Sequence, residues 1–238
     1  VRAWNRIGFK SILVIIGNHT AWKQHKVLSY VLTEALNLGA TVVFLGSDQT
    51  HTTLLSTTSR LFVSKIIPWT KSDKITGSMK KTYLLTSDID LWPIDAKFYQ
   101  PTNKKGILIT NSECCGGFMS NGKQIKMLPM SSILMSVSLW NQVLGLNKGI
   151  WKRKTMSAKN ILKYLESHST NVNIHAPVRK GFNDGWFMDQ TIISTQIHKW
   201  HKKLHSYKRR QRYNLPLVEE RPYSGYRLDR SNWNPNLI

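Results

Sequence analysis

The chain is poor in acidic residues and lacks long apolar runs. Its 238 residues contain 13 Asp and Glu against 34 Lys and Arg, which gives a formal net charge of +21 at pH 7. No stretch approaches the roughly 20 consecutive apolar residues that a membrane-spanning helix requires, and no secretory signal peptide is recognisable. The chain is therefore predicted to lack a transmembrane segment. Its excess of positive charge is predicted to attract anionic partners.

Cysteine is also scarce, because the sequence contains only the adjacent pair Cys114 and Cys115. Neighbouring cysteines rarely bond to each other, so we expect no disulfide framework. Two thiols without further cysteines also make a poor zinc site. The pair is therefore interpreted as two small buried side chains in a tight strand or turn.

The positive charge is concentrated in one segment of the chain. Residues 148–212 carry 15 Lys and Arg and 3 acidic residues, a net charge of +12, which leaves +9 for the other 173 residues. A basic region of this kind attracts phosphates, nucleic acid, acidic glycans or anionic membrane surfaces. Hydrophobic residues make up 41% of the chain, which suffices for a packed core, so wholesale disorder is not expected.

Apolar runs and helical spacings alternate along the first 95 residues. Continuous apolar runs at 11–17 and 41–45 predict strands covered on both faces. Apolar residues spaced by three and four predict a helix capped by Thr20 and ending before Gly39, and a second helix over 54–66. With a third strand at 83–85, this order indicates a parallel α/β sheet, which a strand before Arg2 would complete.

The second half of the chain has a mixed pattern. Strands are expected at 106–110 and 127–136, followed by a short helix, and Ser157 is expected to cap a further helix. The basic stretch 199–212 is compatible with either a solvated helix or a loop. The tail after residue 215 is expected to wrap the domain as an extended segment.

Two acidic residues, Asp88 and Asp90, follow the apolar run at 83–85. Residues i and i+2 of an extended chain point the same way, and ligands bind at the carboxyl ends of strands in open α/β sheets. Two carboxylates in a small space repel each other, and Mg²⁺ or Mn²⁺ held by carboxylates and phosphate oxygens removes that repulsion. The alternative is a solvated turn with two acids.

A second acidic site lies at the start of a predicted helix. Asp184 is a natural cap, and an apolar stripe of Trp186, Ile193, Ile197 and Trp200 follows. Asp189 falls on that stripe, and a buried carboxylate requires either a partner or a chemical role. The alternative to a chemical role is that Asp189 pairs with an arginine or caps a backbone group.

These two segments resemble the GT-A glycosyltransferases, which use nucleotide-sugar donors. The resemblance rests on Ser-Asp-Ile-Asp-Leu-Trp-Pro within 83–94 and on Trp-Phe-Met-Asp-Gln within 184–194. It implies a Rossmann-like GT-A fold of the α/β class, with a mostly parallel central sheet flanked by helices and a mixed C-terminal half. The chain would form a single domain over 1–238 without its first strand. Residues 1–95 would bind the nucleotide-sugar, and 96–238 would form the acceptor-binding half with the basic C-terminal segment.

The resemblance also implies a role for each site residue. The metal, Mn²⁺ or Mg²⁺, would be held by Asp88, Asp90 and Asp229, with His201 or His205 as further candidates. Asp229 lies between Arg227 and Arg230, so a structural ion pair is the alternative for it. The other expected roles are donor binding by Asp88, Asp90 and Trp92, catalysis by Asp189 and Gln190, and acceptor binding by Ser131, Ser132 and Trp186.

The implied activity is metal-dependent transfer of a sugar from a nucleotide-diphosphate donor to an acceptor hydroxyl. The high positive charge makes an acidic acceptor attractive, whether a glycan, a glycoprotein or a nucleic acid. Two alternatives stay open: a catalytically inactive GT-A-like interaction domain, and a basic protein that binds nucleic acid or another polyanion. The expected compartment is the secretory lumen if a membrane anchor has been trimmed, and intracellular otherwise.

Overall fold

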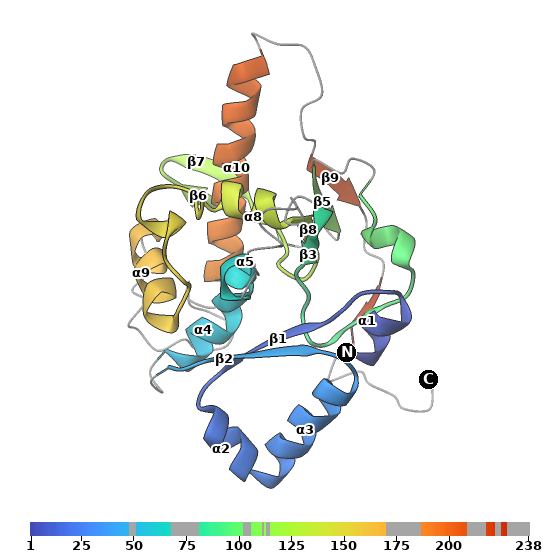
Figure 1. Ribbon diagram of the computed structural model, residues 1–238. Helices are drawn as coiled ribbons and strands as arrows, with labels where there is room; N and C mark the ends of the chain where they lie inside the picture. The colour runs from blue at the N-terminus through green and yellow to red at the C-terminus, as the bar shows by residue number, and fades with distance from the viewer. Residues whose placement is uncertain are drawn as a thin grey trace.

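The computed structural model describes residues 1–47, 51–67, 81–101, 106–110, 112, 115–169, 187–208, 218–221 and 225–227. These residues form an α/β structure with small mixed sheets and no barrel (Figure 1). The α-helices are α1 (Arg2–Arg6), α2 (His19–Gln24), α3 (Lys26–Asn37), α4 (Thr52–Thr58), α5 (Val63–Ile66), α8 (Val137–Val143), α9 (Ala158–His168) and α10 (Met188–Lys208). Short 3-10 helices are η1 (Ser59–Phe62), η2 (Ala96–Tyr99) and η3 (Gly149–Lys152). The strands are β1 (Ile12–Ile16), β2 (Thr41–Leu45), β3 (Tyr83–Leu85), β4 (Leu91–Pro93), β5 (Ile107–Thr110), β6 (Gly117–Ser120), β7 (Lys123–Lys126), β8 (Ile133–Ser136), β9 (Val218–Arg221) and β10 (Gly225–Arg227).

The first half of the chain contains the predicted parallel strand pair. β1 and β2 pair in parallel, with Ile12 opposite Thr41, and α2 and α3 connect them along one side (Figure 1). The expected cap at Thr20 is wrong, because the Asn18 side chain accepts from the backbone N–H of Thr20 at 2.7 Å. Gly39 follows the end of α3 with φ +76°, a conformation that favours glycine, as the sequence predicts.

The described strands do not form one mostly parallel central sheet. β3 pairs with β8 in antiparallel fashion, and the sheet continues in the order β3-β8-β5-β9, with only β5 and β9 parallel. β1 and β2 form a separate sheet among the described residues, and all five residues of β1 are half-buried rather than covered on both faces. β3 is short, and its hydrogen bonds go to a strand from the second half of the chain.

The strand expected over 127–136 is confined to β8. Pro129 lacks a backbone N–H and cannot donate to a ladder, which favours irregular backbone before Ile133. The other small sheets are the β6–β7 hairpin and the antiparallel pair of β4 and β10. The basic stretch beyond residue 199 is helical to Lys208, which favours the helix over the loop for that part.

The main core lies among the four-stranded sheet, the helices α8, α9 and α10, and the helical segment 52–66 of the first half. The predicted helix over 54–66 is divided into α4, η1 and α5, which together bury their leucine and phenylalanine side chains. Trp140 of α8 is buried, and its indole N–H donates to the carbonyl of Leu84 in β3 at 3.1 Å. None of the described helices has the length and apolar character needed to cross a membrane.

Arg221 of β9 attaches the edge of the four-stranded sheet to η2. Its guanidinium donates to the carbonyls of Lys97, Phe98 and Gln100 at 2.9–3.0 Å and to the Glu219 carboxylate. Arginine presents several donors in a fixed planar fork, which a lysine cannot reproduce. This one side chain therefore satisfies three carbonyls around a short helical turn.

We expect Arg221→Ala to lower the free energy of unfolding by about 2–3 kcal/mol, because several charge-assisted hydrogen bonds are lost together. Urea unfolding measures the change. The matched control is Lys126→Ala, which removes a more exposed ion pair to the neighbouring Glu220 and is expected to cost less than about 1 kcal/mol. Equal losses in the two variants would contradict a special role for Arg221.

Candidate functional site

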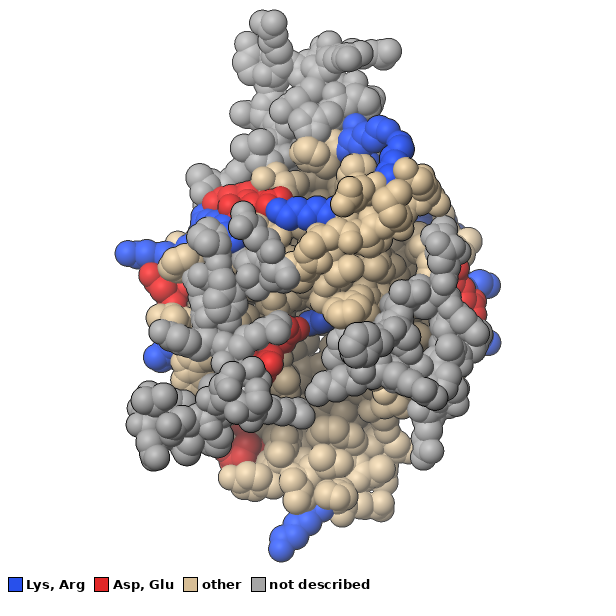
Figure 2. Space-filling model, turned by 180° about the vertical axis from the view of Figure 1, so that it is seen from behind, with Lys and Arg blue, Asp and Glu red and all other residues tan. Residues whose placement is uncertain are grey.

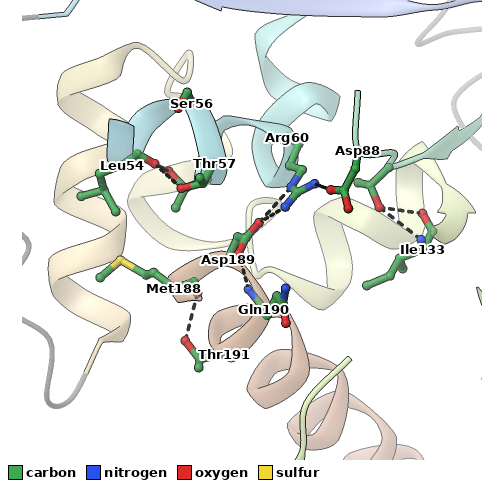
Figure 3. A network of polar contacts seen from close by, with 12 residues as sticks. Leu54, Ser56, Thr57, Arg60, Asp88, Ile133, Met188, Asp189, Gln190 and Thr191 are labelled. Atoms are coloured by element: carbon green, nitrogen blue, oxygen red, sulfur yellow. Dashed lines mark hydrogen bonds and ion pairs between the residues drawn. The ribbon is translucent and has the colours of Figure 1, made fainter. Parts of the chain in front are cut away.

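One arginine joins the two acidic segments that the sequence singles out. Arg60 donates from Nη1 to Asp88 Oδ1 at 2.5 Å, and from Nε and Nη2 to Asp189 Oδ2 at 2.8 and 2.5 Å. Figure 3 shows the guanidinium lying between the two carboxylates. Asp88 lies 28 positions after Arg60 in the sequence, and Asp189 lies 129 positions after it. The contact with Asp189 therefore joins the two halves of the chain.

Each of the three residues in this cluster, Arg60, Asp88 and Asp189, is held in place by its own part of the fold. Arg60 lies on η1 beside the buried Leu61 and Phe62, which anchor that turn in the core. Asp88 lies just beyond β3. There Thr86 holds the chain against Ile133 of β8 through reciprocal hydrogen bonds of 3.0–3.1 Å.

Asp189 is the second residue of α10 and is 1% exposed. Its second carboxylate oxygen, Oδ1, accepts from the backbone N–H of Gln190 at 2.7 Å. Burial raises the pKa of Asp189, and the ion pair with Arg60 acts in the opposite direction. The sequence-based alternative, a carboxylate paired with an arginine and capping a backbone group, therefore describes the contacts that Asp189 makes.

Arg60 is the positive centre of the cluster. Burial by itself would lower the pKa of its guanidinium, but the charges of Asp189 and Asp88 outweigh burial and raise that pKa. Arg60 therefore stays fully charged, and its single positive charge faces two carboxylates. The described cluster carries a net negative charge whenever both acids are ionised.

Asp90 and Trp92 follow Asp88 along the chain and take no part in the hydrogen bonds of Arg60. The backbone turns at Ile89 and Asp90, so the extended-chain argument for two parallel carboxylates does not apply there. Asp90 is half-buried and has no ion pair within the described part of the chain. Trp92 is 38% exposed, with the Arg6 guanidinium 5.9 Å from its ring centre.

One expected acceptor residue, Ser131, and one expected catalytic residue, Gln190, each have a buried polar atom without a partner among the described residues. Ser131 Oγ and Gln190 Oε1 have no hydrogen-bond partner among the described residues. Ser132 is buried, and its carbonyl accepts from the Thr110 N–H at 3.0 Å. Buried polar atoms are rarely left unsatisfied in folded proteins, so the two free oxygens indicate hydrogen-bonding capacity for a further group.

Trp186 and Asp229 lie outside the described residues, as does the His205 side chain, so the structure does not place them. Where the chain is described, no group of three or more His, Cys, Asp and Glu side chains gathers in a way that could hold a metal ion. Asp88 and Asp90 are therefore the two expected metal ligands that the structure places.

The sequence-based reasoning missed Arg60 and misjudged the cysteines. The signal for Arg60 was a cation directly next to Leu61 and Phe62 in an apolar helical segment whose only other cation is Lys65, in a chain with an acid predicted to need a partner. The expectation of no disulfide is wrong for Cys115, which is disulfide-bonded to a partner outside the described residues.

The chain matches no family model, no curated protein and no solved structure. The functional conclusions below therefore rest on the residues and their geometry. The resemblance of 83–94 and 184–194 to GT-A glycosyltransferases remains an expectation from the sequence.

Proposed function

We propose that this chain is a metal-dependent glycosyltransferase that moves a sugar from a nucleotide-diphosphate donor to an acceptor hydroxyl. In this proposal the small mixed sheets belong to a Rossmann-like GT-A domain. The observation that carries it is the meeting of Asp88 and Asp189 at Arg60. Two segments chosen separately for their acids are brought to one place, and Gln190, next to Asp189, has a buried side-chain oxygen without a partner among the described residues.

The candidate metal ligands fit Mg²⁺ or Mn²⁺ in part. These cations accept one or two carboxylates together with phosphate oxygens, and Asp90 and Asp88 would supply the carboxylates. Asp90 is available for this, since it has no ion pair in the described residues, whereas Asp88 is also held by Arg60. When bound, the cation would neutralise the charge of the leaving diphosphate.

Asp189 would serve the reacting centre. A carboxylate whose pKa is raised by burial is a better proton acceptor than a solvated one, which suits a base for the acceptor hydroxyl. Arg60 would hold this carboxylate in position and keep it ionised. Gln190 and Ser131 would accept hydrogen bonds from hydroxyl groups of the sugars, which satisfies their buried oxygens.

The test is thermal unfolding with a panel of nucleoside diphosphates, each with and without Mn²⁺. At about 100-fold excess over Kd, a bound nucleotide is expected to raise Tm by about 5–10 °C in a chain of this size. Asp90→Asn should abolish the metal-dependent part of the shift. Asp95→Asn is the matched control, because the Asp95 side chain caps η2 and asparagine caps equally well.

A second candidate function is a transferase-like interaction domain without catalysis. The observation that favours it is Arg60 itself, because the guanidinium already compensates much of the charge of Asp88 and Asp189 without a metal. In that case no nucleotide would raise Tm with or without Mn²⁺, and Asp90→Asn would behave like Asp95→Asn.

A further inference from the structure

The helix α3 has two apolar sides, and the fold buries only one of them. Leu32 and Ala35 are buried against the rest of the protein. Val27, Tyr30 and Val31 share the neighbouring side of the helix, because residues three and four positions apart lie on one face. These three side chains, called here the α3 patch, are 61%, 67% and 49% exposed. A surface helix needs only one apolar side to fold, so the α3 patch requires a different explanation.

The α3 patch begins close to the tip of a protrusion. α2 and α3 lie on the opposite side of β1 and β2 from α4, and they meet in a corner at the lower end of the molecule in Figure 1. His25 lies at this corner with extended backbone, φ −85° and ψ 118°, and Val27 follows two positions later. The same lower end is mostly uncharged in Figure 2, with a basic side chain projecting from its tip. A convex surface of this kind suits a flat partner.

The charges around the α3 patch are positive. Lys23 and Lys26 stand on either side of the corner, and both are exposed. Residues 1–47 contain five Lys and Arg and a single acid, Glu34. Glu34 lies further along α3, where the Arg2 guanidinium pairs with its carboxylate at 3.6 Å. This protrusion therefore combines exposed apolar side chains with uncompensated positive charge.

We propose that the α3 patch docks the protein on a membrane surface rich in anionic lipid. On a helix that lies in a membrane interface, apolar side chains enter the boundary between headgroups and acyl chains, and lysines stay at the level of the anionic headgroups. Tyrosine suits this boundary, because its ring is apolar and its hydroxyl is polar. Val27 and Val31 supply the apolar contact, and Lys23 and Lys26 supply the attraction to anionic lipid.

Other partners fit the α3 patch less well. A second copy of the chain in a two-fold contact would place the same lysines near one another, and like charges repel. A single-stranded nucleic acid needs several aromatic rings on which its bases stack, and Tyr30 is the one aromatic residue of the patch. The transfer centre is not involved, because α5 and α10 lie on the opposite side of β1 and β2 from α2 and α3 (Figure 1).

The experiment is co-sedimentation of the protein with lipid vesicles at physiological ionic strength. One set of vesicles contains phosphatidylcholine alone, and the other contains about 30% phosphatidylserine in addition. We expect the protein to bind the anionic vesicles at least tenfold more tightly than the neutral ones. Val27→Ser/Val31→Ser should weaken binding to the anionic vesicles about tenfold, because the apolar contact is lost. Lys23→Gln/Lys26→Gln should weaken it by a similar factor through loss of charge.

Two further double variants are the matched controls. Met119→Ser/Ile150→Ser removes two exposed apolar side chains from other elements. Lys159→Gln/Lys163→Gln removes two exposed charges from α9. Both controls should bind like the wild type. An equal loss in a control and in its counterpart on α2 and α3 would overturn the proposal, since overall apolarity or net charge would then explain the binding.

Two other results would also overturn it. One is a failure to bind anionic vesicles. The other is a dimer in sedimentation velocity that Val27→Ser/Val31→Ser converts to a monomer, because a second copy would then cover the patch. The Tm of each variant should stay within about 2 °C of the wild type, since exposed side chains contribute little to stability. Asp90→Asn should leave vesicle binding intact, and Val27→Ser/Val31→Ser should leave the Mn²⁺-dependent nucleotide shift intact, so this proposal and the transferase proposal can fail separately.

Discussion

Replacing Arg60 by alanine is expected to lower the free energy of unfolding by about 3–5 kcal/mol at neutral pH, one of the two largest effects that the structure predicts. The substitution removes the partner of Asp189, a carboxylate that is 1% exposed, and leaves its negative charge buried. Asp88 loses a partner as well, but it is less buried and can be solvated. Urea unfolding of the wild-type protein and the variant measures the difference.

The loss should depend on pH in a defined direction. In Arg60→Ala, burial raises the pKa of Asp189 above its unfolded value without opposition from the guanidinium, so the fold favours the protonated acid. The penalty is therefore fully present above the raised pKa and is relieved as the pH falls toward the unfolded value.

The double variant Arg60→Ala/Asp189→Asn is the control, because it removes the buried charge and keeps the side-chain shape. It should be more stable at neutral pH than Arg60→Ala alone. A penalty that is independent of pH, or additive losses in the double variant, would contradict the buried ion pair.

The other large effect is expected at Tyr164 of α9. Its side chain is fully buried, packs against Phe62 and Trp151 at ring-centre distances of 5.0 and 5.4 Å, and stacks on His168 at 3.9 Å. Tyr164→Ala should therefore cost about 3–5 kcal/mol in the free energy of unfolding, because a large cavity replaces an aromatic ring.

Tyr164→Phe separates packing from hydrogen bonding. The hydroxyl donates to the carbonyl of Leu144 at 2.7 Å, and burial raises the pKa of Tyr164, so the proton is retained at working pH. Loss of this bond should cost about 1–2 kcal/mol, well below the alanine variant. Both are measured by urea unfolding, and equal destabilisation by alanine and phenylalanine would show that the ring contacts contribute little.

The elements of the first half could be predicted from the sequence because their signals are local. The strands predicted over 11–17, 41–45 and 83–85 are found as β1, β2 and β3, and the helix predicted to end before Gly39 is found as α2 and α3. The pairing of β3 was not predictable in this way. Its partner β8 lies about fifty positions further along the chain, and a three-residue strand carries no signal of direction.

The candidate site was likewise only partly predictable from the sequence. Asp189 was recognised as a buried acid from its place on an apolar stripe, and the structure confirms its burial. The identity of its partner was out of reach, because Arg60 lies 129 positions away and many arginines and lysines were available. Long-range ion pairs leave no periodic trace in a sequence, whereas burial on one face of a helix does.

The large sequence separation between Arg60 and Asp189 also affects the order of folding. Contacts between distant residues form late, because the chain between them must first be confined. During synthesis the guanidinium can meet Asp88 long before residue 189 has been added, and until then it has only one of its two carboxylates. The ion pair that arranges the two acids therefore becomes complete only in a chain that has been made and folded through the start of α10.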